Sequence, residues 1–216
     1  MADISQTTVK SRQGNPKVSR DDWLNAARDA LISEGVGEVK ILSLSTKLGV
    51  ARSSFYWYFQ SRSDLLSALL DGWEARNTKS IQDKCSLPAR TIGQAVCHFF
   101  ECFIDPNLFD QGLDFAVREW ARRDARVRAK IDAADSARIA ALIALFHRFG
   151  FSQQDADARA RILYFMQLGY HALDVTEPMT LRMSRLDAYL KGFTGQVADP
   201  ETVGAFQRLA LQLGGE

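Results

Sequence analysis

The chain has 216 residues, of which 46% are hydrophobic and 25% are charged, and its formal net charge is +1. This balance is typical of a folded globular protein and excludes an intrinsically disordered chain. The longest apolar run, Ile139 to Phe146, has eight residues, far fewer than the roughly 18–20 of a membrane-spanning helix. Residues 1–16 also lack the apolar segment of a secretory signal, so we expect a cytoplasmic protein.

The first 18 residues form a polar, basic tail, and the helical pattern begins at Ser19. Ser19 is followed three residues later by Asp22, a capping-box pattern that predicts the start of a helix. Gly35 is the expected end of this helix. One stripe of it is apolar and should face a core, namely Trp23, Ala26, Ala27, Ala30 and Leu31.

Two short helices are expected next. The first runs from Ile41 to Leu48 and ends at the turn formed by Gly49, and the second runs from about Arg52 to Tyr58. A long fourth helix then begins at Ser61 or Ser63. It carries a regular series of large apolar residues, namely Leu65, Leu66, Leu69, Leu70 and Trp73.

The rest of the chain predicts a larger helical body, because a 3.6-residue period recurs to Leu213 and alternating strand patterns are missing. Candidate helices span about Pro88–Ile104, Gln111–Arg123, Arg126–Phe149, Ser152–Asp174 and Leu181–Phe193, with a last helix capped by Asp199 and Pro200. The sequence therefore predicts an all-α protein. It consists of a tail (1–18), a three-helix unit (19–66) and a helical domain (67–216).

The segment from Ile41 to Phe59 has the pattern of a helix-turn-helix, because two short helices flank a tight glycine turn. Phe55 and Phe59, four residues apart, should anchor the second helix on the core. The five consecutive aromatic residues from Phe55 to Phe59 cannot all face inwards. We therefore expect a solvent-facing side made of Arg52, Ser53, Tyr56 and Trp57.

The exposed side has the chemistry of a DNA-reading surface. Arginine can fork onto a guanine edge, serine can donate or accept, and aromatic rings can contact thymine methyl groups or sugars. Residues 1–63 also carry nine lysines and arginines against six acids, so their net charge is +3 while that of the remainder is −2. A basic N-terminal unit suits a polyanionic partner. The competing interpretation is an ordinary aromatic core segment.

About residues 19–70 resemble the TetR family of repressors. The resemblance is carried by the pattern Gly49-Val50-x-x-x-Ser54-Phe55-Tyr56-Trp57-Tyr58-Phe59 followed by Ser61-Arg62-x-Asp64-Leu65-Leu66. It implies base-edge contacts by Arg52 and Ser53 and phosphate contacts by Ser54 and Tyr56. It also implies that Trp57 and Tyr58 lie along the DNA backbone, and that Arg62 holds a phosphate with the help of the helix dipole.

Some positions depart from the family pattern. Ala51 replaces the usual serine that caps the recognition helix, Ser45 replaces a small alanine, and Lys40 replaces a threonine. Each loss should cost about 1 kcal/mol at most. Two interpretations of the tail remain open, because its basic residues Lys10, Arg12 and Lys17 either reach DNA or stay solvated.

The resemblance also implies a homodimer that reads a palindromic double-stranded operator and is built from two late helices per subunit. The best candidate is the helix Gln153–Asp174, and either the C-terminal helix or Leu181–Phe193 would be its partner. The expected interface residues are Ala156, Ala160, Leu163, Gln167 and Tyr170. An intramolecular core is the alternative for the same stripe.

Family members sense small molecules in the body, and ligand binding releases the repressor from its operator. The aromatic-rich middle of this chain suits a lipophilic or aromatic effector. The expected ligand-binding residues are Phe99, Phe103, Phe115, Trp120 and His147. Plain core packing is the alternative for each aromatic residue.

Catalysis is not expected, because the chain has no glycine-rich phosphate loop and no GxSxG or HExxH pattern. Cys85, Cys97 and Cys102 lack metal-ligand spacing, so we expect buried reduced thiols and neither a metal nor a cofactor. A redox sensor is their alternative role. The sequence thus predicts an effector-released transcriptional repressor, and the alternative is a helix-turn-helix protein without an effector.

Overall fold

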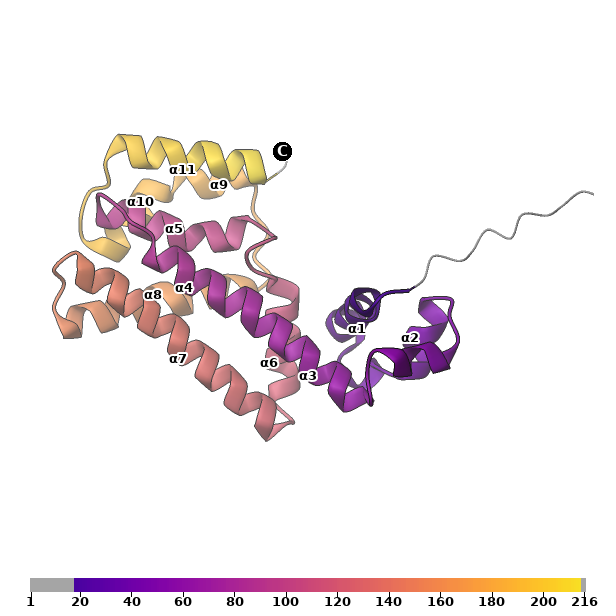
Figure 1. The fold of residues 1–216 in the computed structure, drawn as a ribbon. Coiled ribbons are helices and arrows are strands. Elements are labelled where there is room, and N and C mark those ends of the chain that lie inside the picture. Colours follow the sequence, from indigo (N-terminus) through magenta and orange to yellow (C-terminus); the bar gives the residue numbers. More distant parts are fainter. Residues whose placement is uncertain (1–17, 215–216) are drawn as a thin grey trace, which may run out of the picture.

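The computed structural model describes residues 18–214, and every regular element within that range is a helix (Figure 1). The prediction of an all-α protein is therefore confirmed. Most of the predicted basic tail, including Lys10, Arg12 and Lys17, lies outside the described residues. No helix between residues 18 and 214 is both long and apolar enough to cross a membrane.

The N-terminal unit is built from α1 to α3 with two 3₁₀ helices between them. Its elements are α1 (Arg20–Glu34), η1 (Val36–Glu38), α2 (Ile41–Lys47), η2 (Arg52–Trp57) and α3 (Arg62–Trp73). The predicted capping box is present, since the Asp22 amide donates to Ser19 Oγ and the Ser19 amide donates to the Asp22 carboxylate. The predicted apolar stripe of α1 is buried.

The second helix of the predicted pair lies where the sequence placed it but is wound as a 3₁₀ helix, η2. Gly49, at φ +67°, reverses the chain before it, and Ala51 offers no side chain to cap it. Its bonds are short-range, because the Ser54 amide donates to the Ala51 carbonyl and the Tyr58 amide to the Phe55 carbonyl. The packing of Phe55 and Phe59 on the core therefore holds this segment more than helix propagation does.

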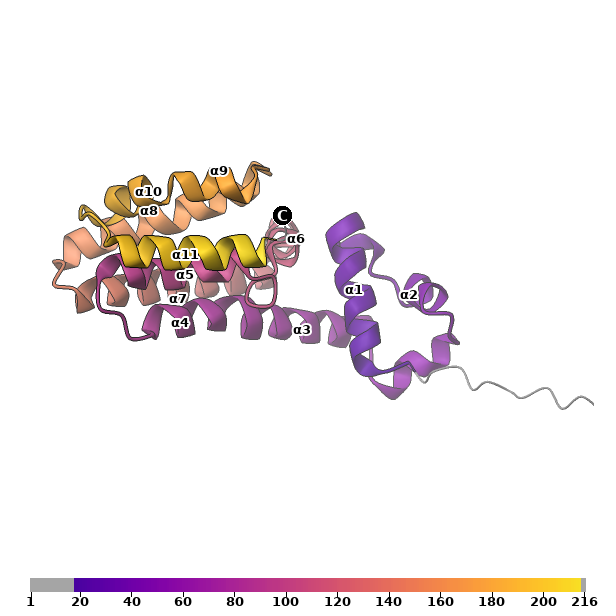
Figure 2. The same ribbon diagram turned by 90° about the horizontal axis from the view of Figure 1, so that it is seen from above.

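A long helical rod leads from the N-terminal unit into the helical body. After α3 the chain passes through one π-helical turn, η3 (Glu74–Thr78), into α4 (Lys79–Ser86) (Figures 1 and 2). The boundary predicted after residue 66 falls inside α3. Leu65 and Trp73, on either side of it, belong to one hydrophobic cluster with α1.

The helical body consists of α4 and seven further helices. They are α5 (Ile92–Ile104), α6 (Gln111–Ala121), α7 (Ala125–Arg148), α8 (Gln153–Ala172), α9 (Met179–Ser184), α10 (Leu186–Thr194) and α11 (Pro200–Leu213). The helix expected from Pro88 begins at Ile92 because Thr91 caps it. The helix expected over Leu181–Phe193 is two helices, and they meet at Arg185, which is bound to Glu177 in the preceding loop.

Helix α6 joins the two parts of the molecule. Its residues Leu113 and Val117 lie in the same hydrophobic cluster as α1 and α3. At its start, the N-cap residue Asp110 forms ion pairs with Arg28 of α1 and Arg76 of η3. A displacement of α6 would therefore directly displace α1, the first helix of the N-terminal unit.

Candidate DNA-binding surface and ligand pocket

The segment η2 presents an exposed polar and aromatic side and a buried aromatic side. Phe55 is fully buried and packs edge-on against Trp23, with ring centroids 5.2 Å apart. The side chains of Arg52 and Ser53 are exposed, and Tyr56 and Trp57 have 51% and 70% of their surface accessible. These exposed side chains make the solvent-facing side of η2 a candidate recognition surface.

Ser54 and Tyr58 are directed towards the protein. The Ser54 hydroxyl donates to the Ala51 carbonyl at 2.8 Å, and the Tyr58 hydroxyl donates to the Val18 carbonyl at 2.8 Å. Tyr58 thereby ties the chain that enters α1 to the end of η2. The DNA contacts expected for these two residues stay predictions.

Arg62, the first residue of α3, binds the loop between α1 and α2. Its Nε donates to the Val39 carbonyl at 2.6 Å and its Nη2 donates to the Val36 carbonyl. Both N–H groups of Nη1 and the second N–H of Nη2 remain for the phosphate contact that the sequence predicts. Of the departures from the family pattern, Ser45 is accommodated because its buried hydroxyl donates to the Leu42 carbonyl at 2.8 Å.

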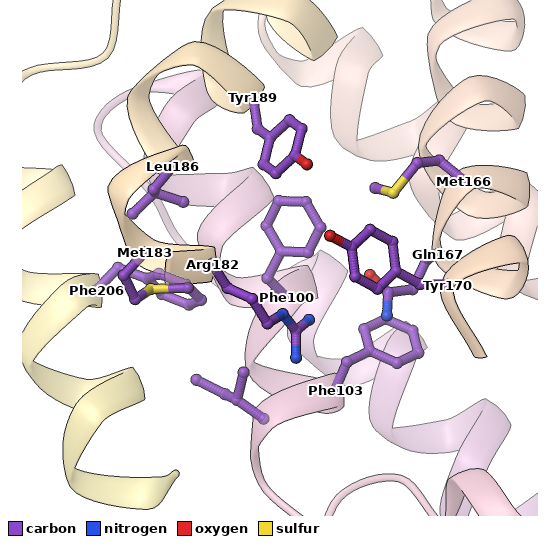
Figure 3. Close-up of a pocket in the computed structure, with 11 residues that line it drawn as sticks. Phe100, Phe103, Met166, Gln167, Tyr170, Arg182, Met183, Leu186, Tyr189 and Phe206 are labelled. Atoms are coloured by element: carbon purple, nitrogen blue, oxygen red, sulfur yellow. The ribbon is translucent and has the colours of Figure 1, made fainter. Parts of the chain in front are cut away.

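A pocket lies in the helical body between α5, α8, α9, α10 and α11 (Figure 3). Most of its walls are aromatic or aliphatic. Its lining residues are Phe100, Phe103, Ile104, Met166, Gln167, Tyr170, Arg182, Met183, Leu186, Tyr189 and Phe206. Its free volume is about 40 Å³, enough for a few water molecules. A larger guest therefore requires the flexible methionine side chains to move.

The five residues predicted to bind a ligand do not line one common pocket, and their contact with a ligand stays a prediction. Only Phe103 lines the pocket, while Phe99 is fully buried in the core. Phe115 lines a separate shallow groove, and Trp120 lines a cleft beside the N-terminal unit. His147 is exposed and lies 2.7 Å from Gln153. Trp120 lies before the start of α7 and His147 lies in its last turn. The 24 residues of α7 span about 36 Å, so these two side chains are far apart.

Most of the residues predicted for the dimer interface face the interior of the subunit. Ala156, Ala160 and Leu163 are fully buried in the hydrophobic core of the body, and Gln167 is nearly so. Tyr170 lines the pocket together with Gln167. On its other face, α8 leaves Ile162, Phe165 and, just past its end, Leu173 between 52% and 78% exposed.

Sequence reasoning missed His171, which lies beside the pocket. Its ring contacts Phe103, Phe109 and Phe115, with centroid separations of 5.4 to 6.4 Å. Burial lowers the pKa of His171 to about 4, so the imidazole is neutral at pH 7. Gln167 Nε2 lies 3.0 Å from His171 Nε2 and donates to it. The sequence signal for this pair was the spacing of four residues between Gln167 and His171, which places both on one face of a helix.

A buried network of charged groups connects α3, α6, α7 and α8. Asp114 accepts from Trp73 Nε1 at 2.8 Å and from Arg138 at 3.0 Å. Arg118 binds Asp114 and Asp135, and Tyr164 donates to Asp135 at 2.7 Å. Burial by itself raises the pKa of Asp114, but the adjacent arginines more than offset this and hold it below the ordinary value.

The N-terminal unit matches a known family. Residues 24–69 match the model described as bacterial regulatory proteins of the TetR family. The match covers α1, α2, η2 and the first part of α3. It therefore includes the whole exposed aromatic surface.

The fold of residues 18–214 is similar to that of solved transcriptional regulators, TetR-family members among them. A TetR-family transcriptional regulator from Marinobacter aquaeolei is 14% identical, with a TM-score of 0.62 over 91% of this chain and 98% of that one. Reduced NemR from E. coli is 16% identical, with a TM-score of 0.59 over 84% and 98%. AmtR from Mycobacterium smegmatis is 18% identical, with a TM-score of 0.56 over 94% and 97%. No curated protein matches the sequence.

Proposed function

Because its N-terminal unit matches the TetR family and its fold is similar to that of TetR-family regulators, we propose that this protein is a transcriptional repressor and not an enzyme. In this proposal it binds a palindromic DNA operator as a homodimer, and a small-molecule effector releases it. The observation that carries the proposal is the exposed side of η2. There Tyr56 and Trp57 project into solvent while Phe55 and Phe59 fix the segment on the core.

The roles on DNA follow from the chemistry of the exposed groups. Arg52 and Ser53 would read base edges in the major groove, where a guanidinium can make two hydrogen bonds to guanine. Tyr56, Trp57 and Ser54 would contact the sugar-phosphate backbone and set the register. Arg62 would reach a phosphate through Nη1 while its other nitrogens hold the loop before α2.

A single η2 covers only a few base pairs, so useful affinity needs two copies related by a two-fold axis. The exposed face of α8, with Ile162 and Phe165, is the surface that we assign to the contact between subunits. Like residues would meet there across the axis, since an isologous interface pairs a patch with itself. Sedimentation velocity of the purified protein tests this assignment.

The route from the pocket to the DNA-binding surface runs through the start of α6. Phe103 in the pocket wall packs against Phe109, with ring centroids 4.9 Å apart. The next residue, Asp110, binds Arg28 of α1. A guest that displaced Phe103 would therefore shift the ion pair that positions α1. The equilibrium would then favour a dimer whose η2 segments are wrongly spaced for the operator.

A DNA-binding protein without an effector is the second candidate, and the narrowness of the pocket favours it. A thermal-shift screen against small metabolites separates the two candidates. A ligand that both stabilises the protein and weakens DNA binding supports the effector-released repressor. If no ligand in the screen stabilises the protein, the result supports the DNA-binding protein without an effector.

The DNA-binding proposal is tested by selecting bound fragments from random duplex DNA with the purified chain. The account predicts enrichment of an inverted repeat and a steep loss of affinity with salt. Arg52→Ala should abolish the enrichment. Arg208→Ala, a change at an exposed arginine of α11, serves as the matched control and should leave it intact. If no sequence is enriched with the unaltered chain, the proposal fails.

A further inference from the structure

The pocket in the helical body carries one formal charge. Of its eleven lining residues, Arg182 is the only one with an ionised side chain, and the others are apolar, aromatic or neutral. Figure 3 shows the Arg182 guanidinium reaching towards the middle of the ring of labelled side chains. It lies over the Tyr170 ring, with Cζ 5.3 Å from the ring centroid.

Arg182 differs from the other arginines that are buried or partly buried between residues 18 and 214. Each of the others donates to a carboxylate or to a backbone carbonyl. These are Arg28, Arg62, Arg76, Arg118, Arg138, Arg159 and Arg185. No such acceptor is bound to Arg182 among the described residues; its close contact is the face of Tyr170.

Glu177, an acidic group close enough to feel the Arg182 charge, is already occupied. Glu177 accepts from Arg185 at 2.7 Å through Oε1 and from the Tyr170 hydroxyl at 2.6 Å through Oε2. Both oxygens of this carboxylate are therefore used by other partners. Arg182 thus keeps its donors and its positive charge available to the pocket, where an ionised partner would be partly withdrawn from water.

We infer that the pocket takes a small organic anion, a monocarboxylate with an aromatic or short aliphatic body, whose carboxylate pairs with the Arg182 guanidinium. A planar guanidinium binds a carboxylate through two parallel hydrogen bonds. The apolar body would lie against Phe100, Tyr189 and Phe206, displacing Met166 and Met183. This inference rests on the proposed function only in treating the pocket as the effector site.

The same lining residues disfavour a cationic ligand and a neutral apolar ligand. A cationic ligand would meet the Arg182 charge with no acidic lining residue to offset it, and like charges in a partly buried site repel strongly. A neutral apolar ligand would leave the guanidinium covered without an acceptor. His171, behind Gln167, is neutral at pH 7 because burial lowers its pKa, so it adds no second charge.

The test is direct binding, measured by isothermal titration calorimetry on the full chain without DNA. The probes are benzoate, phenylacetate, 3-phenylpropanoate and 5-phenylpentanoate, each compared with its neutral amide. At least one acid should bind with a Kd below about 1 mM and at least about tenfold more tightly than its amide. Failure of every acid to bind, or equal affinity of acid and amide, overturns the inference.

Four variants locate the site. Arg182→Gln should reduce acid affinity to that of the amide, whereas Arg182→Lys should retain part of the preference and Arg208→Gln should leave it unchanged. Met166→Trp, which fills the pocket from its wall, should weaken acid and amide alike. Circular dichroism checks the fold of each variant. Unchanged acid binding in Arg182→Gln or Met166→Trp contradicts the inference.

The result is separable from the proposed function. An acid that binds through Arg182 while the chain binds no DNA supports the ligand class and refutes the repressor. Normal binding of a selected operator with no acid binding refutes the ligand class alone. Fluorescence anisotropy of a labelled operator, with and without the tightest acid, distinguishes these outcomes.

Discussion

Arg138 donates to Asp114 Oδ1 at 3.0 Å, and neither side chain is more than 1% exposed to solvent. One residue comes from α7 and the other from α6, so the pair joins two helices in the middle of the molecule. Trp73 and Arg118 bind the same carboxylate. The ion pair is thus fully enclosed and satisfied, an arrangement in which the loss of one partner is costly.

Asp114→Ala should destabilise the protein strongly. It leaves Arg138 buried without its principal counter-ion, and breaking a buried pair in this way costs about 3–5 kcal/mol of unfolding free energy. Urea denaturation followed by circular dichroism measures the loss. Asp83→Ala removes an exposed pair with Lys79 and should change stability by less than about 1 kcal/mol. Equal effects of the two changes would contradict the role given to the network.

The carboxylate of Asp114 should also make the unfolding free energy depend on pH. The pKa of Asp114 is lower in the folded state than its ordinary value of 3.8. Its contribution to stability is therefore fully present above about pH 4 and is lost as pH falls through the folded-state pKa. Asp114→Asn should flatten the pH dependence of the unfolding free energy below about pH 4. An unaltered acid profile in this variant would count against the pairing.

The contact of Arg62 with the loop before α2 predicts a structural effect at a DNA-binding position. Arg62→Ala removes donors to the Val39 and Val36 carbonyls, which should lower the unfolding free energy by about 1–3 kcal/mol. DNA affinity should fall for all sequences without a change of the preferred one. Anisotropy with specific and random duplexes, beside thermal melting, measures both. A selective loss of the preferred sequence would show that Arg62 reads bases instead.

The exposed face of α8 predicts the oligomeric state. Phe165→Asp places a charge on this face and should convert the proposed dimer to a folded monomer, because an unpaired charge is not tolerated in an apolar interface. Sedimentation velocity gives the mass and circular dichroism the fold. Leu87→Asp, at an exposed position just after α4, is the control and should remain dimeric. A dimer that survives Phe165→Asp places the interface elsewhere.

Helix boundaries were predictable where they depend on local chemistry. Ser19 with Asp22, Gly49, and Asp199 before Pro200 each mark a helix end through their own side chain or backbone, and the structure confirms them. The 3₁₀ winding of η2 and the break at Arg185 were not predictable. Both depend on contacts with residues distant in the fold or on a preceding loop.

The exposed side of η2 was predictable because a five-residue aromatic run on a short helix must leave some rings outside. The surroundings of the α8 stripe and of Arg182 in the helical body were not predictable, for a geometric reason. The 3.6-residue period identified the apolar stripe of α8 that holds Ala156 and Leu163, but periodicity does not reveal which neighbour covers a stripe. Here other helices of the same subunit cover it. The lack of a carboxylate partner for Arg182 among the described residues was equally unpredictable, because the sequence does not show that Glu177 binds Arg185.

The central claim is that η2 reads DNA as one half of a symmetric pair. Its most direct test is a stoichiometric titration of the selected duplex, followed by fluorescence anisotropy, with the unaltered chain and with Arg52→Ala. The account predicts two protomers per inverted repeat, and in Arg52→Ala a loss of discrimination against random DNA with residual, salt-sensitive binding. One protomer per site, or full discrimination without the Arg52 side chain, would contradict it.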